Sequence, residues 1–241
     1  MNFSKLLFNT ISCIFAISIS IISTGCSNEE NVIDSSDTDL LSNSKFAAQQ
    51  HNECLSYILE GIKSNGTRSS EYSTEKLREL TIEYASAYLC HKQEISRAEA
   101  DKTLETIDFN PDKDINLFYM QMNDMERDFV SRAIEIVSSG SDIESLLVEV
   151  SNCSLPKNHI VAVLNFISTL DASKKYWEVN IESWDALTDT YTNLSRSPSA
   201  DECLQVAAAD AYYMWWGSLG TGNPVSGACI GAVGSALTAL N

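Results

Sequence analysis

Apolar residues recur with a helical period along most of this chain, and no stretch shows the alternation of a half-buried strand. The most regular stripe lies between Asn110-Pro111 and Gly140. Its apolar members are Ile115, Phe118, Met122, Met125, Phe129, Ala133 and Ile136. Asparagine followed by proline is a typical helix start, because proline needs no amide hydrogen bond in the first turn. The stripe therefore predicts one helix that ends at Gly140.

Start and stop signals divide the rest of the chain into further helices. The other predicted helices run from Ser42 or Ser44 to Asn65-Gly66, from Ser73 onward, over 95–107, from Ser141, from Pro156 (one long helix, or two with a break near 171–173), from Ser199 and from Asn223-Pro224. Together they predict an all-α fold, a single-domain bundle of seven to nine helices over residues 44–241.

Two serines precede a glutamate by three residues, the spacing of a capping box in which each side chain binds a free backbone amide at the helix start. These are Ser141 with Glu144 and Ser199 with Glu202. Five glycine, serine and threonine residues in 217–222 predict a loop before the last helix.

The C-terminal stretch is the most unusual part of the chain, because residues 211–241 carry no charge in a protein whose formal net charge is -17. Small residues recur there every four positions, at Gly227, Gly231, Ser235 and Ala239. This spacing places them on one helix face, where another backbone can approach closely. We expect a glycine-zipper-like hairpin buried at the centre of the bundle. Insertion into a membrane and docking onto a partner protein are the alternatives.

The N-terminus is typical of an export signal, with Lys5 as its only charge before Glu29 and an apolar run over 6–22. Residues 23–26, Ser-Thr-Gly-Cys, resemble a lipobox, although Ser23 stands where an aliphatic residue is usual. We therefore expect a lipoprotein signal peptide over 1–25 and lipidation at Cys26. Five acidic residues and no basic one follow before Lys45, which predicts a disordered tether over 26–43. An ordinary cleaved signal or an uncleaved anchor is the alternative.

The expected export signal and the acidic composition together indicate which partners to expect. The lipid would attach the protein to a membrane of the cell envelope, in the outer membrane or at the surface of a Gram-negative bacterium. Nucleic acid is an unfavourable partner, because phosphate binding depends on lysine and arginine. Of the seven cysteines, five remain after Cys13 and Cys26 are set aside: Cys54, Cys90, Cys153, Cys203 and Cys229. Buried free thiols or one or two disulfides are both open, and the sequence does not give the pairing.

Few residues stand out as candidates for chemistry. Asp210 is a lone carboxylate in an apolar stretch, so it must be paired, hydrogen bonded or protonated. His51 and Asn52 are a second polar group, and His51 lies three residues from Cys54, a spacing that would suit a metal or a nucleophile with its base. We group His51, Asn52 and Asp210 as a candidate polar cluster, either structural or functional. No spacing predicts a metal site, a cofactor or a known catalytic motif.

Tyr176, Trp177 and Trp184 form a candidate aromatic face. Because the two tryptophans lie seven residues apart, a helix places both on the same side. Such a face would serve as a carbohydrate platform or a contact for a partner protein, or it would simply be part of the core.

Three segments together resemble a group of uncharacterised exported lipoproteins of the Bacteroidota type. They are HNECLSYIL from His51, KYW with Trp184, and AAADAYYMWWG with the glycines after it. The resemblance implies no activity. We expect a lipid-anchored helical protein that acts by binding rather than by catalysis. A membrane-active or bacteriocin-like protein that uses the C-terminal hairpin is the alternative, and an enzyme with His51 and Asp210 in one pocket is a third hypothesis.

Overall fold

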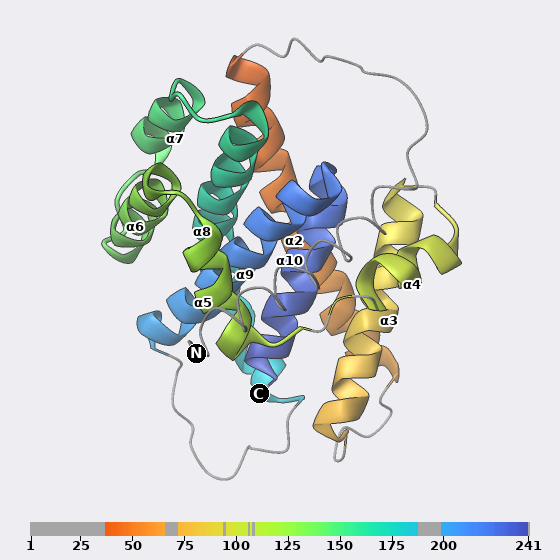
Figure 1. The fold of residues 1–241 in the computed structure, drawn as a ribbon. Helices are drawn as coiled ribbons and strands as arrows, with labels where there is room; N and C mark the ends of the chain where they lie inside the picture. The colour runs from red at the N-terminus through yellow and green to blue at the C-terminus, as the bar shows by residue number, and fades with distance from the viewer. Residues whose placement is uncertain are drawn as a thin grey trace, which may run out of the picture. The chain divides into compact units, whose positions relative to one another are not determined.

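The computed structural model describes residues 37–65, 72–93, 95–105, 107, 109–187 and 199–240, and these form an all-α domain with no strand among them (Figure 1). The predicted fold class is therefore confirmed. Nine helices lie in this part of the chain: α2 (Asp37–Asn65), α3 (Thr74–Gln93), α4 (Arg97–Glu105), α5 (Pro111–Gln121), α6 (Asp124–Ser138), α7 (Glu144–Ser151), α8 (Lys157–Asp185), α9 (Ala200–Thr221) and α10 (Pro224–Ala239). The expected signal peptide and Cys26 lie outside the described residues.

Helices α9 and α10 form the middle of this domain (Figure 1). α9 contacts α5, α6, α8 and α10, while α10 contacts α2, α3, α5, α8 and α9. Every residue of α10 from Ser226 to Leu237 is buried. A helix that is apolar on all sides is stable in water only when other helices surround it. The uncharged C-terminal stretch is thus part of the core in this structure.

Several helix boundaries follow the local signals that predicted them. Ser199 and Glu202 form the expected capping box at the start of α9. Asn223 caps α10 by accepting hydrogen bonds from the amides of Val225 and Ser226, and Pro224 takes the first position. Gly140 has a φ of 70°, which a residue without a β-carbon adopts readily after a helix end.

The single helix predicted from Asn110 to Gly140 is wrong, because the chain breaks at Met122 and Asn123 into α5 and α6. Met122 is extended, with ψ at 143°, and Asn123 forms a capping box with Glu126 that begins α6. Phe118 and Met122 before the break and Phe129 and Ala133 after it are buried, whereas Met125 of the same stripe is 40% exposed. In the sequence, the apolar spacing continues across the break without interruption. Hydrophobic periodicity alone therefore does not reveal the break.

Two further local predictions are also wrong. Ser141 makes no capping box with Glu144. Instead, Ile143 precedes α7 without a side-chain cap, and the Glu144 carboxylate pairs with Lys45 of α2 at 2.7 Å. The predicted loop over 217–222 is helical, since α9 continues to Thr221 and ends only at Gly222, whose φ is 62°. Packing of this segment against α10 overrides the weak helix propensity of its glycines.

Helix α2 begins at Asp37, so the described end of the expected tether, residues 37–43, is helical rather than disordered. Leu40 and Leu41 pack against the hydrophobic core, which stabilises this first turn and a half. Helix α8 is continuous over 29 residues and has no break at 171–173.

Glycines allow α9 and α10 to approach each other closely. A β-carbon added at Gly217 of α9 would lie 3.0 Å from the Cα of Gly227 in α10. One added at Gly227 would lie 3.1 Å from the Ser218 hydroxyl, and Gly234 packs against the ring of Tyr213. The expected helix-packing role of Gly227 therefore matches its surroundings. None of the helices in the described ranges combines the length and the apolar character that crossing a membrane requires.

We predict that Gly217→Ala destabilises the protein by about 1–3 kcal/mol, because the added methyl group must displace the backbone of α10. Gly220→Ala, one turn later in the same helix, is the matched control. A β-carbon there has no neighbour within 4 Å, and alanine is the better helix former by about 0.5–1 kcal/mol. Urea denaturation of both variants checks this. Equal stability of the two would contradict the close approach of α9 and α10.

Candidate functional site

The structure brings His51 of α2 and Asp210 of α9 together in the core. His51 Nε2 lies 3.6 Å from Asp210 Oδ1, and both side chains are 0% exposed. α8 lies beside them and supplies Ser173 and Trp177. The Trp177 Nε1 donates a hydrogen bond of 2.8 Å to Asp210 Oδ2, and the Ser173 hydroxyl donates to the same oxygen. We call these four residues with Asn52 the buried polar cluster.

Burial raises the pKa of Asp210, because removing the carboxylate from water disfavours its charged form. His51 acts against this shift through its charge and its hydrogen-bonding capacity, and the Trp177 N–H adds a smaller opposing effect. The carboxylate thus has partners from two helices besides its own, which is the condition for burying an acid at tolerable cost.

The other side of the His51 ring is fixed by Asn52. His51 Nδ1 lies 3.0 Å from Asn52 Oδ1, and the Asn52 amide donates a 3.1 Å hydrogen bond to the backbone carbonyl of Ala172 in α8. Gly231 of α10 leaves room for the ring, since a β-carbon there would be 3.0 Å from His51 Cδ2. The candidate cluster of His51, Asn52 and Asp210 is therefore one connected unit that joins α2, α8 and α9.

This unit contains a serine, a histidine and an aspartate, but their order does not suit nucleophilic catalysis. In a hydrolytic triad the histidine lies between the serine and the acid, so that it can take the serine proton. Here the acid lies between Ser173 and His51. All three side chains are also fully buried. Neither His51 nor Asp210 is among the residues that line the open groove beside this cluster.

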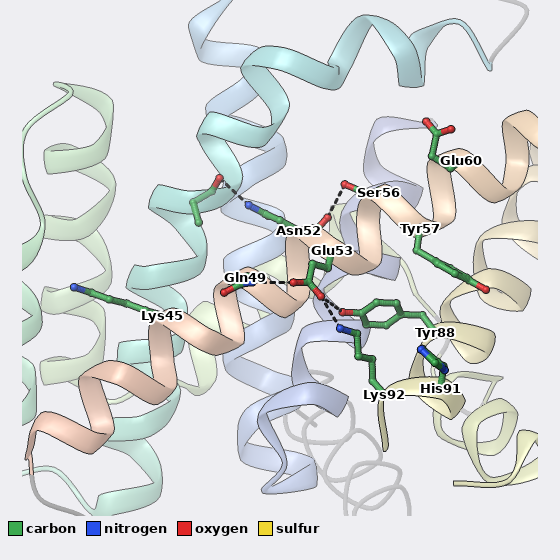
Figure 2. A pocket seen from close by; sticks show the side chains of 11 residues that line it. Lys45, Gln49, Asn52, Glu53, Ser56, Tyr57, Glu60, Tyr88, His91 and Lys92 are labelled. Atoms are coloured by element: carbon green, nitrogen blue, oxygen red, sulfur yellow. Dashed lines mark hydrogen bonds and ion pairs between the residues drawn. The ribbon is translucent and has the colours of Figure 1, made fainter. Parts of the chain in front are cut away.

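An open groove lies on the surface next to this cluster, along α2 and the C-terminal end of α3 (Figure 2). Its volume is about 870 Å³. The side chains that line it are those of Lys45, Gln49, Asn52, Glu53, Ser56, Tyr57, Glu60, Tyr88, His91, Lys92 and Ala172. Asn52 is the only member of the buried polar cluster among them.

Glu53 is the centre of the hydrogen bonds in this groove (Figure 2). Its Oε2 accepts from Lys92 Nζ at 2.7 Å and from the Tyr88 hydroxyl at 3.1 Å, while its Oε1 accepts from Gln49 at 2.9 Å. The hydrogen bond from Lys92 holds the pKa of Glu53 below its usual value, against a smaller effect of burial. This network connects α2 to α3 and holds the floor of the groove in place.

The groove combines balanced charge with an exposed aromatic ring. Its two lysines, Lys45 and Lys92, balance its two glutamates, Glu53 and Glu60, in a chain of net charge -17. Tyr57 is 45% exposed, with its ring 5.8 Å from that of Tyr88. The groove therefore offers an aromatic surface, hydrogen-bond donors and acceptors, and no net charge when histidine is neutral.

The candidate aromatic face is not a surface. Trp177 and Trp184 are both 0% exposed, and their rings lie 5.5 Å apart within the core. Trp184 Nε1 donates to the Tyr176 hydroxyl at 3.2 Å, and Tyr176 is partly buried against the core. Burial of the two indole rings excludes a carbohydrate platform at Trp177 and Trp184. The exposed aromatic ring beside a groove is Tyr57 instead.

A second buried polar group was not predicted from the sequence. Glu126 of α6 is 1% exposed, and its Oε1 accepts from His159 Nδ1 at 2.8 Å and lies 3.3 Å from Trp215 Nε1. Its Oε2 accepts from the backbone amide of Asn123, so this carboxylate also caps α6. The Asn-x-x-Glu spacing of 123–126 was a visible signal for the cap. Nothing local indicated that His159 and Trp215 would meet it.

These features define the class of the protein as an all-α bundle with a sealed polar core and one polar groove beside it. Comparisons with protein-family models, with curated proteins and with solved structures found no match. Within the described residues, no three histidine, cysteine, aspartate or glutamate side chains are grouped in a way that could hold a metal ion.

We predict that Asp210→Asn changes how stability depends on pH. Because the folded pKa of Asp210 is raised above its usual 3.8, its stabilising contribution is present below that value and is lost as pH rises through the folded pKa. Each unit of difference is worth about 1.4 kcal/mol. The stability of wild type relative to Asp210→Asn should therefore fall as pH is raised from about 4 upward.

Urea denaturation across this range measures the difference. Asp201→Asn, an exposed carboxylate in the same helix, is the control and should give a nearly constant difference from wild type. A wild type that gains stability over Asp210→Asn as pH rises would show that the paired charges, rather than burial, dominate at Asp210.

Proposed function

We propose that this chain is a lipid-anchored, helical protein of the cell envelope that binds a ligand and does not catalyse a reaction. The observation that supports it most is the separation of the two polar features. The candidate catalytic side chains, His51 and Asp210, are sealed in the core, whereas the adjacent groove is open and lined by groups suited to recognition. A catalytic residue must reach its substrate, and a binding residue needs only a surface.

The lipid anchor rests on the sequence of residues 23–26, and the helical domain that begins at Asp37 is compatible with it. Eleven residues over 26–36 would separate the lipid from α2. The burial of α9 and α10 also favours binding over the membrane-active alternative, because these helices would have to leave the core to insert into a bilayer.

The proposed ligand is neutral and rich in hydroxyl groups, as a short oligosaccharide is. Its apolar ring faces would stack on Tyr57, and its hydroxyls would meet the amides of Gln49 and Asn52 and the carboxylate of Glu60. Sites for small ligands commonly combine an apolar surface with a few directional polar groups. Balanced charge in the groove favours a neutral ligand over a strongly acidic or basic one.

We predict that lipid labelling depends on Cys26. Cells that express the full chain and are fed a radioactive or clickable palmitate should label the wild type and lose all label with Cys26→Ala. Cys13→Ala is the matched control and should keep the label, because position 13 would lie within the removed signal peptide. An unlabelled wild type would contradict the proposed anchor.

We predict that binding to immobilised neutral oligosaccharides depends on Tyr57. Tyr57→Ala should lower affinity by about 2- to 13-fold, because an aromatic contact is worth about 0.5–1.5 kcal/mol. Tyr119→Ala is the control: Tyr119 is 39% exposed but lies outside the groove. A glycan array with neutral and acidic members makes the measurement. Absence of binding to neutral glycans, or equal loss in both variants, would contradict the proposed ligand.

A further inference from the structure

The orientation of the Asn52 side chain is set by the groups on either side of it. Asn52 is partly buried and lies between the buried polar cluster and the groove (Figure 2). Its amide nitrogen donates to the backbone carbonyl of Ala172 in α8 at 3.1 Å. Because a carbonyl oxygen only accepts hydrogen bonds, the nitrogen rather than the oxygen of the amide must face Ala172. The amide oxygen then faces His51, whose Nδ1 lies 3.0 Å away.

This orientation determines which nitrogen of His51 carries a proton. The Asn52 oxygen cannot donate, so His51 Nδ1 must be the donor of the 3.0 Å contact. With a proton on Nε2 alone, two lone pairs would face each other at that distance, and the histidine is fully buried. His51 is therefore either the neutral Nδ1–H tautomer or the doubly protonated ring. Both forms donate from Nδ1 to Asn52.

Asp210 is compatible with both of these forms at the opposite edge of the ring. Its Oδ2 accepts hydrogen bonds from Ser173 and Trp177, and its Oδ1 lies 3.6 Å from His51 Nε2. Neither Oδ1 nor Nε2 has any other hydrogen-bond partner among the described residues. A proton between these two atoms serves both of them, whether the acid or the ring carries it. In either case Nδ1 keeps its own proton and remains the donor toward Asn52.

We propose that His51 is a positioning residue for the groove, because its Nδ1–H holds the Asn52 amide in one orientation toward a ligand. The inference rests on the proposed binding function, and it gives the buried polar cluster a part in recognition. A side-chain amide has two N–H groups and two oxygen lone pairs. Ala172 takes one N–H and His51 takes one lone pair, so one donor and one acceptor of this groove-lining amide remain for a ligand.

The consequence for binding is that the amide is ordered before a ligand arrives. Half a turn about the last side-chain bond of Asn52 would exchange its donor and its acceptor. That turn would place the amide oxygen against the Ala172 carbonyl and the amide N–H groups against the His51 N–H, so it is disfavoured at both ends. A hydroxyl-rich ligand therefore loses less entropy on binding than it would with a freely turning amide.

The first experiment locates the ring protons in the wild-type protein and needs no ligand. The full chain is prepared in detergent with isotopically labelled histidine, and nitrogen–proton NMR correlations identify the protonated ring nitrogens. The chain has three histidines, and His51→Gln identifies the His51 signals by their loss. We expect a directly bonded, slowly exchanging proton on His51 Nδ1. A ring protonated on Nε2 alone would overturn the proposal.

Two substitutions of His51 separate its contact with Asn52 from its contact with Asp210. A glutamine amide reaches the place of ring Nε2, and an asparagine amide reaches the place of Nδ1. His51→Gln thus retains a polar group toward Asp210 and loses the donor to Asn52, whereas His51→Asn does the reverse. Affinity for a neutral oligosaccharide should fall by about 2- to 13-fold in His51→Gln, the effect of one hydrogen bond. His51→Asn should bind more tightly than His51→Gln, whichever of the two is more stable.

His159→Gln is the matched control. His159 also pairs with a buried carboxylate, that of Glu126 at 2.8 Å, but it does not line the groove, so this variant should bind as wild type does. Equal loss of affinity in His51→Gln and His51→Asn would mean that only the bulk of the ring matters, and the proposal would be wrong. A wild type with the proton on His51 Nδ1 that binds no neutral oligosaccharide would contradict the proposed ligand and support the fixed amide. Binding together with a bare Nδ1 would mean the opposite.

Discussion

The carboxylate of Asp210 imposes a constraint on the rest of the structure. It lies in a helix that is otherwise apolar and fully enclosed, where an unpaired charge would cost several kcal/mol. Its partners come from α2 through His51 and from α8 through Ser173 and Trp177. The hydrogen bonds from Ser173 and Trp177 to Asp210 Oδ2, together with His51 Nε2 at 3.6 Å from Oδ1, therefore favour one arrangement of α2, α8 and α9.

The small residues of α10 complete the same arrangement. Gly231 gives the His51 ring its space, and Gly217 with Gly227 allows α9 and α10 to lie close enough that Asp210 is enclosed. The glycines of α9 and α10 therefore allow the close packing that the buried polar cluster requires. Larger side chains at these positions would separate the helices, and the carboxylate would then either meet water or lose its partners.

The parts of this structure that the sequence predicted are those that depend on local chemistry. Ser199 with Glu202, Asn223 with Pro224 and the uncharged C-terminus each signal their structure within a few residues. The apolar pattern does not predict the break at Asn123, because apolar residues continue at helical spacing on both sides of it. The helical state of 217–221 depends on α10, which is a tertiary contact and leaves no local signal.

For the candidate site too, the features that depend on local sequence were predictable, and those that depend on tertiary contacts were not. The need of Asp210 for a partner follows from its apolar neighbours in the sequence, and the structure places His51 of the same candidate cluster beside it. The roles of Ser173 and Trp177 required knowing that α8 passes beside α9. Spacing placed Trp177 and Trp184 on one face correctly, but spacing does not tell a buried face from an exposed one. The groove around Glu53 forms where α3 contacts α2, so no local motif in the sequence predicts it.

Asn52 is the residue at which the core and the proposed binding surface meet. Its amide oxygen lies 3.0 Å from the His51 ring, its amide nitrogen binds the backbone of α8, and its side chain also lines the groove (Figure 2). A substitution there would remove a ligand contact and loosen the buried polar cluster at once, so its effects on binding and on stability would not be separable. Tyr57 has no such second role toward that cluster, since its contacts are with the rings of Tyr84 and Tyr88. For this reason a substitution of Tyr57, unlike one of Asn52, tests recognition without removing a contact of the buried polar cluster.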